Sequence, residues 1–376
     1  MKRIGTAVLC FVMLFALLAF PGFAAETEKT ATAASSEDIL LRGYQNQLNT
    51  TGASAVSVRI IAEIANVENY TEVGFRITTA KKGEMNLPVT TVYSKLTAAK
   101  TDESGTAFEE EIMPKTAGNY LFALILTDIN VSANAEMTVV PYAVGKDGVT
   151  VTGGSGDLQK PAGTTSFAAA SASTYQVTFQ TEDGTKISTV SVNRGENAPL
   201  PAAPSDGYWA FNLAELVNIT ENKTITLGKV ATSAYNKTVT KIYTSLKNQD
   251  ANAEKYALTL GTTNEGGTAP NQNSSWTFLY QLGQTLQFTA DFADMLELRM
   301  RCLDTTSMTV AVYVDGYLIN SVTVNGVDQK NATNLSVAEL IPAGQHTVRL
   351  VVTDLVGTPS DTRGFCISEI HIKEKV

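Results

Sequence analysis

Apolar and polar residues alternate with a period of two along most of the chain from residue 39 onward. Residues 56–61 (VSVRII) and 73–78 (VGFRIT) show this period clearly, and it is typical of half-buried β-strands. Turn signals such as the Lys-Asp-Gly triplet at 146–148 separate the runs, and no convincing amphipathic helix intervenes. The pattern predicts an all-β protein that begins with an immunoglobulin-like β-sandwich at residues 39–153.

Changes in composition divide the rest of the chain into segments. Residues 154–173 combine Gly, Ser, Pro and Ala without an apolar period, which predicts a linker. Strand-like runs return after it, so we expect a small β module at 174–230 and a final β domain at 234–376. Residues 26–38 are rich in Ala, Thr, Glu and Ser, and they predict a flexible leader before the first sandwich.

The middle module has the most specific pattern in the chain. Two alternating runs, 175–180 and 186–192, flank the Glu-Asp-Gly triplet at 182–184, which is a strong hairpin signal. A Pro-rich crossing, the aromatic Gly-Tyr-Trp at 207–209 and a closing strand at 223–227 follow. This order resembles the InlB B-repeat family of Listeria and other Firmicutes surface proteins. The resemblance implies a spacer or adhesion module and no chemistry.

The two outer domains resemble other extracellular modules. The order RGYQ, VRIIAEI, VGFRI, YLFA and VVPYAV within 41–153 is similar to an uncharacterised β-sandwich of Firmicutes cell-surface proteins, which has no activity to transfer. In the last domain, VYVDG at 312–316, AGQHTVRLVV at 343–352 and CISEIHI at 366–372 resemble the galactose-binding-like jelly rolls, which include carbohydrate-binding modules. That resemblance implies a jelly-roll sandwich at 234–376 and favours glycan binding.

The amino terminus has the three parts of a secretory signal peptide. A basic start, an apolar run over residues 4–20 and a small-residue exit predict that residues 1–25 are removed on export. A transmembrane anchor is the alternative, but no stop-transfer flank follows the short apolar run. We therefore expect a mature chain without a membrane span, which is secreted, extracellular or loosely associated with the cell surface.

The charge balance disfavours nucleic acid as a partner. The chain has 37 Asp and Glu against 28 Lys and Arg, a formal net charge of −9, and its basic residues form no stripe or Arg cluster. Affinity for nucleic acid comes mainly from neutralising phosphates, so a chain of this composition is a poor candidate.

Two cysteines, Cys302 and Cys366, remain after the predicted signal peptide, and both lie in the last domain. In an exported chain, two cysteines in one domain favour a disulfide. A pair of buried thiols is the alternative, and the sequence leaves both open.

The sequence offers little for catalysis or metal binding. Its only histidines, His346 and His371, alternate within predicted strands, and no HxH, HExxH or CxxC spacing is present. Asp291 and Asp294 are neighbours in one run, whereas glycosidase carboxylates face each other across a cleft. We predict no catalytic residue, no cofactor and no metal site, with a structural calcium ion near these aspartates as a minority alternative.

A loop in the last domain suits glycan binding. Asn271, Asn273 and Trp276 lie together in NQNSSW, so an aromatic ring that can stack on a sugar is next to amides that can bind hydroxyl groups. A tryptophan at the start of an alternating run can equally be a core residue.

The sequence therefore predicts a non-catalytic extracellular binding protein. A polysaccharide or a host or cell-surface glycan is the expected partner, bound through the C-terminal jelly roll. The alternative is a cell-surface adhesin or structural spacer that binds a protein.

Overall fold

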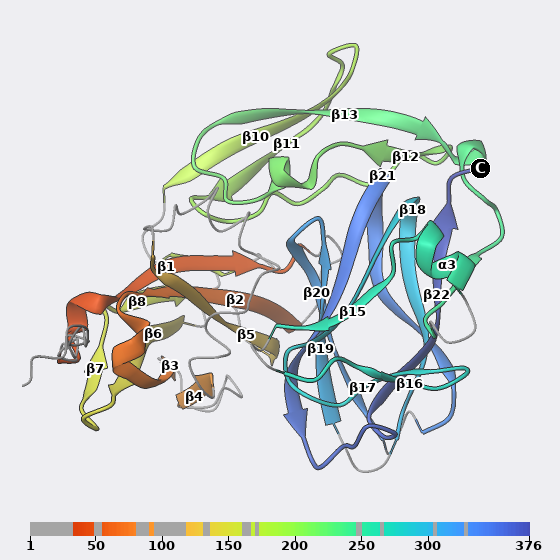
Figure 1. The fold of residues 1–376 in the computed structure, drawn as a ribbon. Coiled ribbons are helices and arrows are strands. Elements are labelled where there is room, and N and C mark those ends of the chain that lie inside the picture. Colours follow the sequence, from red (N-terminus) through yellow and green to blue (C-terminus); the bar gives the residue numbers. More distant parts are fainter. Residues whose placement is uncertain are drawn as a thin grey trace, which may run out of the picture. The chain divides into compact units, whose positions relative to one another are not determined.

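Strands dominate the part of the chain that the structure describes, as the alternating pattern predicts (Figure 1). The computed structural model describes residues 33–48, 55–79, 90–93, 118–130, 136–159, 167–169, 173–245, 250–263, 267–303, 307–326 and 330–376. Among the described strand pairs, β10 and β13 run parallel and the others run antiparallel. The predicted all-β class is confirmed, whereas the predicted signal peptide at 1–25 lies outside the described residues.

The first β-sandwich consists of two facing sheets. One sheet has the order β1-β2-β5, and the other has the order β4-β3-β6-β8-β9 with β7 paired to β6. Between them, the rings of Phe75 and Phe122 pack 5.1 Å apart and are fully buried. The strands and short 3₁₀ helices of this sandwich are η1 (Ser36–Asp38), β1 (Ile39–Asn46), β2 (Ala55–Ile64), η2 (Val67–Asn69), β3 (Tyr70–Thr79), β4 (Thr90–Tyr93), β5 (Tyr120–Asn130), β6 (Glu136–Gly145), β7 (Thr150–Thr152), β8 (Gly156–Gln159) and β9 (Ala168–Ala169).

The predicted linker at 154–173 is wrong in its described parts. Strand β8 forms a ladder with β6, and Phe167 is fully buried in the core of the first sandwich. The side chain of Asn46 donates from Nδ2 to the Phe167 carbonyl at 2.7 Å and accepts from the Phe167 N–H at 2.8 Å. These segments therefore belong to the sandwich. Their composition does not predict this, because the hydrogen bonds to Phe167 come from Asn46, a distant residue on β1.

The predicted leader at 26–38 is also wrong at its described end. The backbone N–H of Ser35 donates to the Tyr70 hydroxyl at 3.0 Å, and that hydroxyl donates to Asp38 at 2.6 Å. Burial and the hydrogen bond to Asp38 raise the pKa of Tyr70 to about 12, so the hydroxyl remains a donor. Residues 35–38 are thus attached to the first sandwich.

The middle module is a four-stranded sheet with one covered face. Its order is β11-β10-β13-β12, and the segment between β11 and β12 contributes buried residues such as Ala198 to the core under the sheet. Trp209 is in this core, and its indole N–H donates to the carbonyls of Pro201 and Ala202, both at 3.1 Å. The elements are β10 (Thr174–Thr181), β11 (Lys186–Asn193), β12 (Gly207–Ala210), η4 (Leu213–Leu216), β13 (Lys223–Ala231) and η5 (Thr232–Ala234).

The last domain is a sandwich made by bending one sheet over itself. Strands β18 and β21 pair from Thr285 with Val351 to Met300 with Thr333, and both change direction at register shifts near Asp294 and Leu340, which have φ values of 71° and 58°. One half of β18 pairs with β15 and the other half pairs with β22. The elements are β14 (Thr240–Tyr243), α3 (Asp250–Lys255), β15 (Thr259–Thr262), β16 (Asn271–Gln272), β17 (Thr277–Leu279), β18 (Gln284–Cys302), β19 (Ser307–Val314), β20 (Tyr317–Asn325), β21 (Thr333–Val356) and β22 (Phe365–Glu374).

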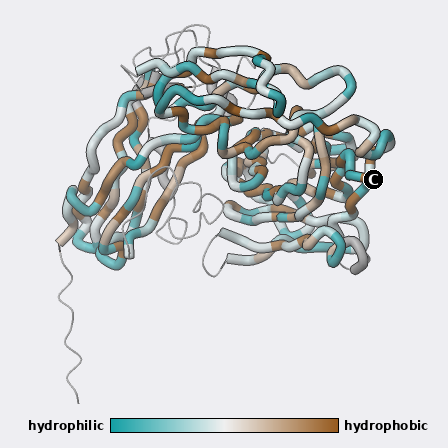
Figure 2. The backbone as a smooth tube through the Cα atoms, turned by 90° about the horizontal axis from the view of Figure 1, so that it is seen from above, coloured by the Kyte–Doolittle hydropathy of each residue, from teal (hydrophilic) through white to brown (hydrophobic). Residues whose placement is uncertain are grey.

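A large apolar core fills this last sandwich. Phe288, Phe292, Leu298, Met300 and Ile370 are fully buried in it. Figure 2 shows brown, hydrophobic positions recurring along its strands between hydrophilic ones, as the period of two requires. The short helix α3 is not predicted by the sequence pattern. Among the described residues, no helix has the length and apolar character needed to cross a bilayer.

Candidate functional site

The β16–β17 hairpin brings together the three residues that the sequence offers for ligand binding. Its turn is closed by Asn273, whose Oδ1 accepts from the backbone N–H groups of Ser275 at 2.9 Å and Trp276 at 2.8 Å. The backbone N–H of Asn273 also donates to the Trp276 carbonyl at 3.0 Å. Asparagine suits this position because its short side chain can bond to its own backbone two or three residues on. Residues 273–275 are exposed.

The two asparagines have different environments. Asn271 donates from Nδ2 to the Asp361 carbonyl at 2.7 Å, which attaches the hairpin to the loop before β22. Asn273 uses Oδ1 for the turn, and its Nδ2 has no hydrogen-bond partner among the described residues. Asn271 is therefore mainly structural, whereas Asn273 has amide donors available for a ligand.

Trp276 is half-buried. This degree of burial is intermediate between that of an exposed ligand-binding ring and that of a core residue, the two roles that the sequence allows. The guanidinium carbon of Arg301 lies over its ring, 4.3 Å from the centroid. The indole also packs against a small cluster on the outer side of the sheet, formed by Phe278, Tyr280 and Cys366. Trp276 is thus fixed in orientation by its neighbours and is partly accessible. Sequence reasoning missed Arg301, although the alternation in LELRMRC places both of its arginines opposite the core-facing residues.

Cys302 and Cys366 are buried thiols, so the alternative of a disulfide is wrong. In the β18–β22 ladder, Cys302 pairs with Phe365 and Arg301 pairs with Cys366. The two cysteines are therefore one position out of register on adjacent strands, where side chains point to opposite faces of the sheet. Cys302 packs in the large core and Cys366 packs beside Trp276. Bridging them would require their Cβ vectors to converge, and the register prevents this.

We expect both cysteines to resist alkylation in the native protein. Burial raises the pKa of the Cys366 thiol to about 12, so almost none of the reactive thiolate is present at about pH 8. Intact-mass analysis after iodoacetamide treatment should find neither residue modified in native protein and both modified in guanidinium without reductant. If the cysteines react in guanidinium only after a reductant is added, they form a disulfide, and the β18–β22 register given above is wrong.

Both histidines have an oxygen atom within hydrogen-bond distance of each ring nitrogen. The ring nitrogens of His371 are 2.8 Å from Glu297 Oε1 and 2.7 Å from Glu369 Oε2. Those of His346 are 2.7 Å from Asp315 Oδ2 and 2.8 Å from the Pro342 carbonyl. Each ring therefore lies between two oxygen atoms of its own domain. An imidazole ring donates to both of its partners only when both nitrogens carry a proton.

The aspartates considered for calcium are paired with lysines. Asp294 forms an ion pair with Lys373, and Asp291 forms one with Lys375 at 3.2 Å while it accepts from the Tyr235 hydroxyl at 3.3 Å. Within the described ranges, no group of three or more His, Cys, Asp or Glu is arranged to hold a metal ion. The lysines neutralise the carboxylates that a calcium ion would need.

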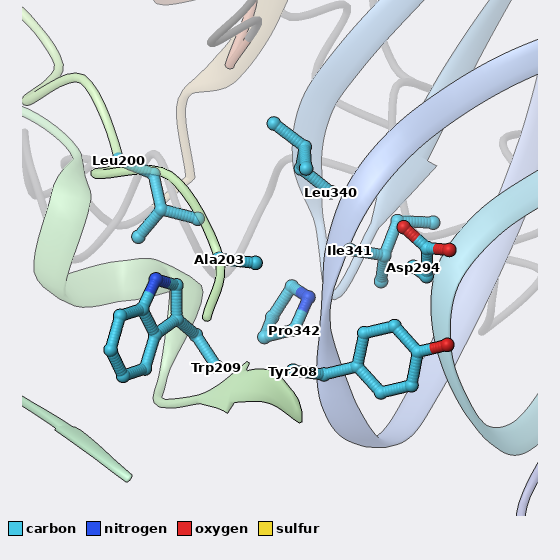
Figure 3. Close-up of a pocket in the computed structure, with 8 residues that line it drawn as sticks. All are labelled: Leu200, Ala203, Tyr208, Trp209, Asp294, Leu340, Ile341 and Pro342. Atoms are coloured by element: carbon cyan, nitrogen blue, oxygen red, sulfur yellow. The ribbon is translucent and has the colours of Figure 1, made fainter. Parts of the chain in front are cut away.

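A hollow between strand β12 and the bend of β21 is too small for a ligand (Figure 3). Figure 3 shows Trp209 on one side, Asp294 and the ring of Tyr208 on the other, and Pro342 between them. Its volume is about 10 Å³, close to the lower limit for one water molecule. Tyr208 packs edge-on against Tyr235 at 5.7 Å, so this region is a packing contact. The hairpin around Trp276 remains the best candidate site among the described residues.

Comparisons with known proteins give slight structural similarity. No family model matches the chain, and no curated protein matches its sequence. A carbohydrate-binding module, CBM36, in complex with calcium and xylotriose is 16% identical, with a TM-score of 0.24, and the match covers 35% of this chain and 97% of that one. The CBM36-1 domain of a multidomain xylanase from the hindgut metagenome of Trinervitermes trinervoides is 16% identical, with a TM-score of 0.22, covering 31% and 95%.

A family two carbohydrate esterase from Cellvibrio japonicus also matches, with 9% identity and a TM-score of 0.26. That match covers 36% of this chain and 33% of the esterase, so the chain spans about a third of the esterase's length. Similarity this slight assigns neither a ligand nor an activity. The resemblance of residues 174–230 to the InlB B-repeat family stays a prediction.

Proposed function

We propose that this chain is an exported, non-catalytic protein that binds carbohydrate through the β16–β17 hairpin of its last domain. The observation that carries the proposal is the turn itself. It holds a half-exposed Trp276 in a fixed orientation on Arg301, next to the unused amide donors of Asn273. An aromatic surface for the apolar side of a sugar and donors for its hydroxyl groups are the elements that a glycan site needs.

The absence of catalysis is part of the proposal and rests on the partners of the ionisable groups. His371 links Glu297 and Glu369, and His346 links Asp315 to a backbone carbonyl. These contacts leave neither ring placed as a base beside a nucleophile, which an acyl-transfer or hydrolytic site would require. Export rests on the signal-peptide pattern of residues 1–25.

A protein-binding adhesin is the second candidate, and the outer face of the middle module favours it. Strand β11 is the last strand in the order of its sheet. On the polar face, Thr178 and Thr189 hydrogen bond at 3.0 Å, and Gln176 donates to Ser191 at 3.3 Å. An edge strand with a polar face can pair with an extended segment of another protein.

Replacement of Trp276 with alanine tests the proposal. An aromatic platform contributes on the order of 1 kcal/mol beyond its buried area, so polysaccharide affinity should fall several-fold. The measurement is a glycan array followed by affinity electrophoresis of the full mature chain. Trp276→Phe is the matched control, because it retains a ring in the same turn and should keep part of the affinity.

The thermal unfolding transition separates the two roles of Trp276. If Trp276→Ala loses cooperative unfolding, the residue is a core anchor and the site is wrongly assigned. If the wild-type chain binds no polysaccharide, the adhesin candidate replaces carbohydrate binding.

A further inference from the structure

Arg301 has no anionic partner among the described residues, although it is half-buried. It lies on β18 facing away from the core, between the buried Met300 and Cys302. Its Nε is buried and makes no hydrogen bond, and the residue forms no ion pair with any described carboxylate. The stacking contact with Trp276 at 4.3 Å is its main interaction. A guanidinium is always protonated in proteins, so this position carries a permanent positive charge.

The groups next to Arg301 do not neutralise this charge. Cys366 pairs with Arg301 across the β18–β22 ladder, but burial raises the pKa of its thiol to about 12 despite the opposing effect of Arg301. The thiol therefore remains neutral and is not a counter-ion. A neutral neighbour leaves the guanidinium free to attract an anion from solution.

The carboxylates on the same side of the sheet have other side-chain partners. Glu369 contacts His371 at 2.7 Å, Lys241 at 3.1 Å and Arg299 at 3.9 Å. Glu297 contacts His371 at 2.8 Å. Burial alone would raise the pKa of Glu369, but hydrogen bonds from His371 and Lys241 outweigh it and lower this pKa. Glu369 lies opposite Arg299 in the β18–β22 ladder, and Glu297 is four residues before Arg301 on β18, so these acids contact other side chains and not Arg301.

A half-buried charge without a counter-ion is unfavourable, and an arginine offers planar, paired donors that match a carboxylate. We propose that the Trp276 hairpin binds an anionic glycan, with a sugar carboxylate on Arg301 and the sugar ring against Trp276. This inference rests on the proposed carbohydrate-binding function and specifies its ligand as an acidic polysaccharide. The amide donors of Asn273 contact hydroxyl groups of the same sugar.

The net charge of −9 does not oppose a local contact of this kind. Electrostatic effects between exposed charges are screened beyond about 8 Å at physiological ionic strength, so the nearest charge dominates. Binding of an acidic glycan should accordingly weaken as salt is added.

The test compares acidic polysaccharides with their carboxyl-reduced forms. Polygalacturonate, hyaluronan and glucuronoxylan are titrated against the wild-type chain, Arg301→Gln and Arg299→Gln by affinity electrophoresis. Arg299→Gln is the matched control, because it removes the same charge from the same side of the same strand, and its contact with Glu369 is long, at 3.9 Å. Thermal unfolding confirms that each variant is folded.

We expect the wild-type chain to bind at least one acidic polymer about tenfold more tightly than its carboxyl-reduced form, as one charge-assisted contact provides. Arg301→Gln should abolish this preference and retain binding of the reduced polymer, whereas Arg299→Gln should keep it. Equal binding of both forms, or a preference that survives in Arg301→Gln, overturns the acidic ligand while carbohydrate binding stands. Absence of binding to any of the six polymers, together with an empty glycan array, overturns both.

Discussion

Replacement of Asn46 with alanine is expected to lower the free energy of unfolding of the first sandwich by about 3 kcal/mol. The side chain is buried and makes both hydrogen bonds to the backbone of Phe167, at 2.7 and 2.8 Å. Alanine would leave a buried N–H and a buried carbonyl without partners, and each such group costs about 1–3 kcal/mol. Chemical denaturation of the mature chain, followed by far-ultraviolet circular dichroism, measures the change.

Asn334→Ala is the control for this prediction, because Asn334 is exposed on β21 and should change stability by less than about 0.5 kcal/mol. A loss below about 1 kcal/mol in Asn46→Ala would mean that Phe167 finds other partners. The attachment of residues 167–169 to the first sandwich would then not depend on Asn46.

His371→Phe should destabilise the last domain by about 2–4 kcal/mol at neutral pH. The ring is 5% exposed, and its two nitrogens lie 2.8 Å from Glu297 Oε1 and 2.7 Å from Glu369 Oε2, so the ring separates two carboxylates that would otherwise face each other. Denaturation at about pH 7 measures the loss. In the His371→Phe background, Glu297→Gln should recover part of it, because it removes the repulsion between the two charges. No recovery would show that lost packing, not charge, explains the effect.

The same network predicts how stability depends on pH. The pKa of Glu369 is lowered from its ordinary value of 4.5, because hydrogen bonds from His371 and Lys241 outweigh burial. A carboxyl whose pKa is lower in the folded state contributes stability that is complete above the ordinary value and is lost as pH falls through the folded pKa. Stability should therefore decline below about pH 4.5, and His371→Phe should show a shallower decline. An unchanged slope in that variant would remove His371 as a cause of the shift.

The β architecture could be predicted because the alternation of apolar and polar residues is local information. VSVRII at 56–61 and LELRMRC at 296–302 indicate strands without knowledge of their partners. The turn around Asn273 is likewise local, since its hydrogen bonds span two and three residues. The sequence could therefore place Asn273 and Trp276 together.

Features that depend on strand register could not be predicted. Whether Cys302 and Cys366 share a face depends on how two strands more than 60 positions apart align, and a shift by one residue reverses the answer. The burial of Phe167 depends on Asn46, which is 121 positions away, so composition alone indicated a linker. Arg301 becomes part of the candidate site only because β22 pairs with β17 on one side and with β18 on the other.

The most direct measurement of the central claim uses the two tryptophans of the chain. Their indole N–H groups give separate signals in a nitrogen-15 NMR spectrum, and Trp209 is an internal control because its N–H is bonded to Pro201 and Ala202 in a buried core. Xylo-, manno- and galacturono-oligosaccharides are titrated to about millimolar concentration, which suits weak glycan binding. We expect a saturable shift of the Trp276 signal with at least one oligosaccharide and none for Trp209. Saturable binding that leaves the Trp276 signal unmoved, or no response to any oligosaccharide, would contradict this expectation.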